Sequence, residues 1–111
     1  MELVLLLQLR LATDSIDFQE VIALIDQTYT YTPTRFANGT VINQAGTNEG
    51  SCKIFYFAKL QKLTENQTLA LFGSYYRDDV LANPMGEDHD NIRHFIKSGW
   101  SGFKFDGVPL T

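Results

Sequence analysis

Two capping boxes, each followed by a regular apolar stripe, constrain the fold of this chain more than any other sequence feature. Residues 17–20 read Asp-Phe-Gln-Glu and residues 64–67 read Thr-Glu-Asn-Gln. In this motif the first side chain accepts a hydrogen bond from a free N–H at a helix start, and the fourth reaches back. Apolar residues then recur at steps of three and four, the spacing of one helix face. They are Phe18, Val21, Ile22, Ile25 and Tyr29 after the first box, and Leu69, Phe72, Tyr76 and Val80 after the second.

Three further helices are expected from caps and composition. The leucine-rich segment 1–12 is predicted to pack into the core as a first helix. It is shorter than the about 20 apolar residues that span a bilayer, and it has no positive charge where a signal peptide needs one. Ser51 is a suitable cap for an apolar, buried helix over residues 52–60. Asp88 or Asp90 is expected to cap a last helix that Gly99 ends. The predicted fold class is all-α: one compact domain, residues 1–111, of about five helices.

The segment between residues 30 and 50 is rich in asparagine, glycine and turn-forming residues. Such a long connection is uncommon in a compact domain and is often functional. A short hairpin around Asn38 and Gly39 is one arrangement that the composition allows. Near the C-terminus, Phe103 and Phe105 alternate with charged residues. This pattern predicts a short extended segment that packs back onto the helices.

Charge and cysteine content exclude several classes of function. The chain has 111 residues, of which 9 are basic and 13 acidic, and its formal net charge is -4. A nucleic-acid binder needs a basic face to displace counterions from phosphates, and binding to anionic membranes needs one as well. We therefore expect no nucleic acid and no membrane among the partners. The single cysteine excludes an internal disulfide and a multi-cysteine zinc motif, and no sequence fingerprint of a nucleotide cofactor is present.

Cys52 is the sharpest candidate for catalysis. It follows the proposed helix cap, and the partial positive charge of a helix N-terminus stabilises a thiolate. A nearby histidine would complete a nucleophilic pair, and His89 and His94 are the two histidines of the chain. The alternative is that Cys52 is a small buried hydrophobe, which is the usual environment of a free cysteine. Whether the protein is an enzyme is left open.

His89 and His94 do not form a helical chelating pair. They are five residues apart, which is roughly 140° around a helix axis. Asp90 and His94 are four apart and share a face, but ordinary surface pairs have the same spacing. We therefore predict no metal site and no cofactor.

The asparagine-rich loop is predicted to bind a ligand. Its backbone N–H groups and amide side chains would converge at a helix N-terminus, which suits an anion or a carboxylate, and arginines from other segments would complete the pocket. The predicted ligand-binding residues are Asn38, Asn43, Asn48, Glu49, Arg77, Asn91 and Arg93. The alternative is a purely structural loop, in which asparagine and glycine serve turns with positive φ. The expected partner is a protein or a small polar ligand.

Several ordered blocks, spread over most of the chain, match a known family. The blocks comprise Phe36, Asn38 and Gly39; Asn43, Ala45, Gly46, Asn48, residues 50–53, Phe55, Phe57 and Ala58; Thr68, Leu69, Phe72, Gly73 and residues 75–77; Val80, Leu81 and Pro84; His89, residues 91–93, Phe95, Gly99, Trp100 and Gly102. In these residues the chain resembles the HopJ type III effector family. The match runs from about Phe18 to Pro109.

The resemblance implies a bacterial protein whose relatives include a proposed type III effector. It supplies no catalytic residue, cofactor or reaction. Three functions are therefore considered: a binding or interaction module that uses the surface of residues 34–51, a thiol- or histidine-dependent enzyme, and a bacterial housekeeping protein that is not secreted. The expected location is the bacterial cytoplasm, with delivery into a host cell by a type III system as the alternative.

Overall fold

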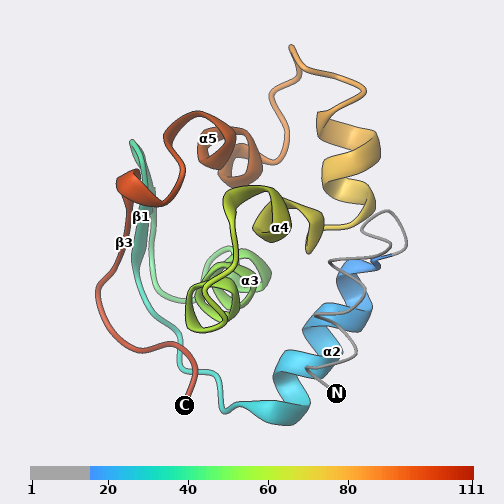
Figure 1. The fold of residues 1–111 in the computed structure, drawn as a ribbon. Coiled ribbons are helices and arrows are strands. Elements are labelled where there is room, and N and C mark those ends of the chain that lie inside the picture. The colour runs from blue at the N-terminus through green and yellow to red at the C-terminus, as the bar shows by residue number, and fades with distance from the viewer. Residues whose placement is uncertain (1–15) are drawn as a thin grey trace.

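A computed structural model describes residues 16–111, and Figure 1 shows their arrangement around helix α3. The elements are α2 (Phe18–Thr28), β1 (Phe36–Asn38), β2 (Val41–Asn43), α3 (Glu49–Leu60), α4 (Glu65–Ala70), the π-helix η2 (Tyr75–Val80), α5 (Asp90–Ser98), the 3-10 helix η3 (Trp100–Gly102) and β3 (Phe103–Phe105). The predicted first helix over residues 1–12 lies outside the described residues. No helix within residues 16–111 has the length and apolar character needed to cross a membrane.

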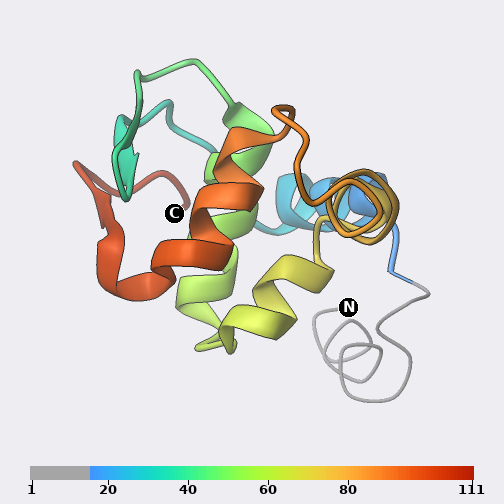
Figure 2. The ribbon, with the colours of Figure 1, turned by 90° about the horizontal axis from the view of Figure 1, so that it is seen from above.

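The prediction of an all-α fold is wrong, because the protein contains an antiparallel sheet in the order β2-β1-β3. The hairpin of β1 and β2 turns at Gly39, as the sequence allowed, and pairs Asn38 with Val41. The extended tail pairs with the other side of β1, with Phe36 opposite Phe105. Its strand is the same segment in which aromatic residues alternate with charged ones. The fold is therefore mixed, with helices around α3 and a small sheet on one side, as Figures 1 and 2 show.

Aromatic side chains fill the space between the sheet and the helices. Phe55 of α3 is fully buried, and its ring centroid lies 5.2 Å from that of Phe72, 4.9 Å from that of Phe95 and 4.6 Å from that of Phe103. Phe36 of β1 is also fully buried, with its ring stacked on Phe103. The sheet therefore contributes to the same core as α3 and α5 and is not an appended hairpin.

Caps are present at both predicted helix starts, but within residues 16–111 only the Thr64 motif forms the complete, reciprocal capping box. Asp17 accepts a hydrogen bond from the Glu20 N–H at 3.1 Å. Thr64 and Gln67 form a reciprocal capping box. Helix α3 differs from the prediction, because it begins at Glu49 instead of following a Ser51 cap, and Asn48 is its N-cap residue.

The predicted helix over residues 65–80 is divided in two at Gly73. This glycine has a φ of +61°, and an added Cβ would lie 2.9 Å from the backbone nitrogen of Phe18. The chain therefore turns where it passes the start of α2, and the π-helix η2 continues in a new direction. The turn places Tyr75 beside Phe18, with a distance of 5.1 Å between ring centroids.

Candidate functional site

Four of the predicted asparagines form one hydrogen-bonded network that joins the hairpin to helices α3 and α5. Asn91 donates to Asn43 Oδ1 at 2.9 Å and accepts from Asn43 Nδ2 at 3.0 Å. Asn38 Nδ2 donates to the Asn91 backbone oxygen at 2.7 Å, and Asn48 Nδ2 donates to Asn43 Oδ1 at 2.7 Å. Asn38, Asn43 and Asn91 are buried. Because buried amides are stable only when they are paired, this network fixes the hairpin against α5.

A pocket of about 630 Å³ opens beside the network. Its lining comes from α2, from β2 and the loop after it, from the start of α3, from η2, and from the start of α5. Polar lining groups include Asn43, Asn48, Ser51, His89 and Asn91; apolar ones include Phe18, Val41, Phe72, Tyr75 and Ile92. This volume lies in the range of about 300–1,000 Å³ that is typical of small-molecule sites.

Two helices begin at this pocket with their N-cap residues in the same backbone conformation. Asn48 caps α3 with φ 48° and His89 caps α5 with φ 53°, and neither side chain bonds to its own helix start. The first turn of a helix leaves backbone N–H groups without helical partners. These donors, together with the Asn48 amide, suit a ligand's oxygen acceptors. The carboxylates of Glu87 and Asp90 in the same lining suit its donors.

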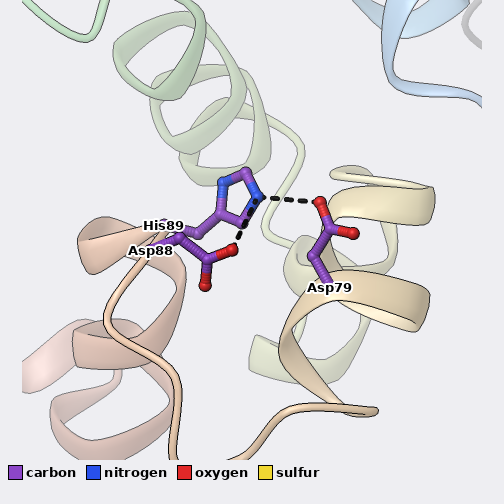
Figure 3. A group of neighbouring side chains, drawn as sticks. All are labelled: Asp79, Asp88 and His89. Atoms are coloured by element: carbon purple, nitrogen blue, oxygen red, sulfur yellow. Dashed lines mark hydrogen bonds and ion pairs between the residues drawn. The ribbon is translucent and has the colours of Figure 1, made fainter.

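His89 is oriented by a carboxylate from a different element. Its Nε2 lies 2.9 Å from Asp79 Oδ2 and 4.0 Å from Asp88 Oδ2. Figure 3 shows the two carboxylates beside the imidazole. The imidazole also packs against the Tyr75 ring, with 5.1 Å between centroids. A hydrogen bond of this kind fixes the orientation of a histidine ring. His89 is therefore a positioned group in the lining of the pocket.

The Asp79, Asp88 and His89 ligand atoms lie within 4.8 Å of one another, close enough for all three to reach one ion. Arg93 already occupies this group, since its guanidinium pairs with Asp88 Oδ1 and donates to the Asn83 oxygen at 2.8 Å. Hydrogen bonding from Arg93 lowers the pKa of Asp88. The arrangement thus resembles an arginine-bridged turn more than a cation site, and the absence of a metal stays a prediction.

Other predicted site residues lie apart from the pocket lining. Arg77 donates to the Ile16 backbone oxygen at 2.9 Å and so connects η2 to the segment just before α2. Arg93 braces the loop before α5, and His94 contacts Thr40 Oγ1 at 3.2 Å. Glu49 is exposed in the first turn of α3. The structure therefore brings the predicted asparagines and His89 together. Arg77 lies apart from them, whereas Arg93 contacts Asp88 beside His89 without lining the pocket.

Cys52 lies inside α3 and not at its free end. Its N–H donates to the Asn48 oxygen at 3.0 Å, and its side chain is fully buried, with Sγ 3.9 Å from the Thr34 oxygen. Burial, followed by the charge of Glu49, raises the pKa of the thiol to about 11, although Lys53 opposes the shift. A nucleophilic role for Cys52 stays a prediction, and this environment favours the protonated thiol at neutral pH.

Alkylation of the folded protein by iodoacetamide at pH 7.5 is expected to be at least about 100-fold slower than that of a model thiol. A pKa near 11 lowers the thiolate fraction by about that factor, and burial restricts access further. Mass spectrometry over time measures the rate, with urea-unfolded protein as the control. A native rate equal to that of the unfolded chain would contradict the buried-thiol geometry.

Sequence patterns did not identify Phe18, Tyr75, Asp79 or Glu87 as parts of the site. Phe18 and Tyr75 belong to apolar stripes that predict core packing, and both are half-buried in the pocket lining. Asp79 is ten residues from His89, so only the turn between η2 and α5 brings them together. The spacing of residues along a helix cannot predict this contact between two separate helices.

Comparison with known proteins places these features in a wider group. A family model described as HopJ type III effector protein matches residues 4–110. A solved crystal structure described as the unknown function protein VPA0580 is 44% identical in sequence and superimposes with a TM-score of 0.93. The alignment covers 96% of this chain and 88% of that chain. No protein with a curated description matches the sequence.

Proposed function

This chain belongs to the HopJ type III effector protein family, and we propose that it is a small binding module whose ligand occupies the asparagine-lined pocket. The single observation that carries the proposal is the convergence of Asn43, Asn48, Asn91 and His89 on one pocket of about 630 Å³. These residues come from the hairpin, the loop before α3 and the start of α5. Asparagines that served only the turns of the loop would not need to meet side chains from α5 at one pocket.

The chemistry of the lining defines the kind of ligand. Donors at the starts of α3 and α5 suit a carboxylate or another polar group rich in oxygen. Phe18 and Tyr75 offer ring surfaces to an apolar body, while Glu87 and Asp90 favour a positive or hydrogen-bond-donating end. The ligand we propose is therefore a small amphipathic molecule with polar groups of both kinds.

Ligand-observed NMR with a library of small amphipathic acids and amino acids tests this proposal. We expect hits whose binding is weakened about tenfold in Asn48→Ala, because the variant removes one amide from the pocket and one hydrogen bond to a ligand contributes about 1 kcal/mol. Asn48 is exposed, so this variant should fold. Asn66→Ala, at an exposed position in α4, is the matched control. Equal binding by both variants would exclude the asparagine-lined pocket as the ligand site.

The cellular location belongs to the same proposal. The family description names a type III effector, which supports delivery into a host cell; residence in the bacterial cytoplasm is the other location we consider. A translocation reporter fused to the chain separates the two, since signal in host cells requires secretion.

A further inference from the structure

Within residues 16–111, β3 is an edge strand whose outer side carries unpaired backbone groups. It pairs with β1 alone in the described sheet. Between β1 and β3, the Gly39 N–H donates to the Gly102 oxygen and the Asp106 N–H donates to the Arg35 oxygen. Phe103 and Phe105 lie between these two bonds, opposite Asn38 and Phe36. In an antiparallel ladder, residues flanked in this way direct their own N–H and C=O groups away from the partner strand. The Phe103 N–H bonds to the Trp100 oxygen. The Phe103 carbonyl and both Phe105 backbone groups form no hydrogen bond with residues 16–111 that would close this edge.

An apolar groove of about 310 Å³ lies between this strand and the C-terminal end of α3, apart from the asparagine-lined pocket. Leu63, Trp100, Phe103 and Phe105 provide its apolar walls. The Trp100 indole N–H donates to the Leu63 oxygen at 3.3 Å, which fixes the tryptophan ring. The groove is thus formed before any partner binds.

The charged groups of this groove are cationic although the chain as a whole is acidic. Lys59 and Lys62 belong to the lining, and both are exposed. Neither forms an ion pair with a carboxylate of residues 16–111. Lys59 Nζ instead lies 5.5 Å from the Phe105 ring centroid. The nearby Glu65 carboxylate accepts the Trp100 backbone N–H at 3.2 Å. In a protein with a net charge of -4, two lysines that form no ion pair within residues 16–111 and lie beside an apolar groove favour an acidic partner.

From this combination we propose that the edge of β3 is a docking site for an extended acidic peptide of a partner protein. The peptide adds a strand to the sheet and bonds to the free backbone groups of Phe103 and Phe105. One apolar side chain enters the groove, and carboxylates of the same peptide contact Lys59 and Lys62. This mode uses main-chain bonds for affinity and the groove and lysines for specificity.

Fluorescence anisotropy with a labelled eight-residue peptide, made of glutamates around one central leucine so that leucine and carboxylates share a face of the strand, tests the inference. We expect the double variant Lys59→Glu/Lys62→Glu to weaken binding by about tenfold or more, because both exposed positions then repel the probe. Lys97→Glu, at an exposed position of α5, is the control for a change in charge alone. Peptides with lysine in place of each glutamate, or with serine in place of the leucine, should not bind.

A peptide with N-methyl groups on alternate residues separates strand addition from simple charge attraction. Methylation removes donors without removing carboxylates, so we expect it to abolish binding. Unchanged binding of the methylated peptide, or equal losses in Lys97→Glu and the double variant, would overturn the proposal. Concentration-dependent dimerisation without peptide binding would also overturn it, because the edge would then pair with a second copy of the chain.

Discussion

Asn91→Ala is expected to lower the free energy of unfolding by about 3 kcal/mol. Asn91 is 6% exposed and forms two hydrogen bonds with Asn43. Its removal leaves buried amide groups of Asn43 and Asn38 with fewer partners, and each unsatisfied group costs about 1–3 kcal/mol. Alanine favours the helical conformation more than asparagine, so the loss cannot come from α5 itself. Urea denaturation followed by circular dichroism measures the change.

Asn66→Ala provides the matched comparison, because Asn66 is exposed in α4. Its effect is expected to stay within about 0.5 kcal/mol. A double-mutant cycle of Asn43→Ala and Asn91→Ala should give a coupling energy of about 1–3 kcal/mol, as expected for neighbours in one network. If Asn91→Ala is no more destabilising than Asn66→Ala, the network does not hold the hairpin against α5.

Gly73→Ala is expected to destabilise the protein by about 3–4 kcal/mol. The left-handed backbone of Gly73, with φ +61°, costs an L-residue about 1–2 kcal/mol. The new Cβ would also lie 2.9 Å from the Phe18 nitrogen and 3.0 Å from the Ile16 oxygen. Backbone atoms cannot rotate away as a flexible side chain does, so η2 or the start of α2 must shift, at a further cost of about 1–3 kcal/mol. Thermal unfolding monitored by calorimetry measures the loss.

Gly46→Ala separates the two components of this effect. Gly46 also has a positive φ, +87°, but an added Cβ meets nothing within 4 Å. We expect a loss of about 1–2 kcal/mol from the backbone conformation alone. Equal losses of stability at Gly46 and Gly73 would show that the close contact between Gly73 and the start of α2 does not contribute to the destabilisation.

Local sequence signals predicted the helices well where one residue decides the structure. The caps at Asp17 and Thr64 both accept the expected backbone hydrogen bond. The break at Gly73 could not be predicted, because the apolar stripe continues past this residue. The position requires glycine because the backbone of Phe18 lies too close for a side chain. The sheet was missed for a related reason. The sequence allows a hairpin around Asn38 and Gly39 and predicts an extended tail, but the pairing of the two joins Phe36 to Phe105, far apart in the sequence.

The candidate site was predicted only in part, because local patterns reveal contacts between near neighbours and not contacts between distant segments. An asparagine cluster before a helix indicates side-chain hydrogen bonding, and Asn43 and Asn48 do bond to each other. The arginines were assigned to the site only because of their charge. In the structure, Arg77 instead donates to the Ile16 backbone oxygen. Helix boundaries also mattered for Cys52, because a start at Glu49 moves the thiol from the first turn into the buried interior.

A titration of 15N-labelled protein with the best hit, followed through the asparagine side-chain NH₂ signals, tests most directly whether the ligand site is the amide-lined pocket. We expect the signals of Asn43, Asn48 and Asn91 to shift together and to fit one dissociation constant. Asn66, exposed on α4, should not shift. Saturable binding that leaves the three network signals unmoved would contradict the account.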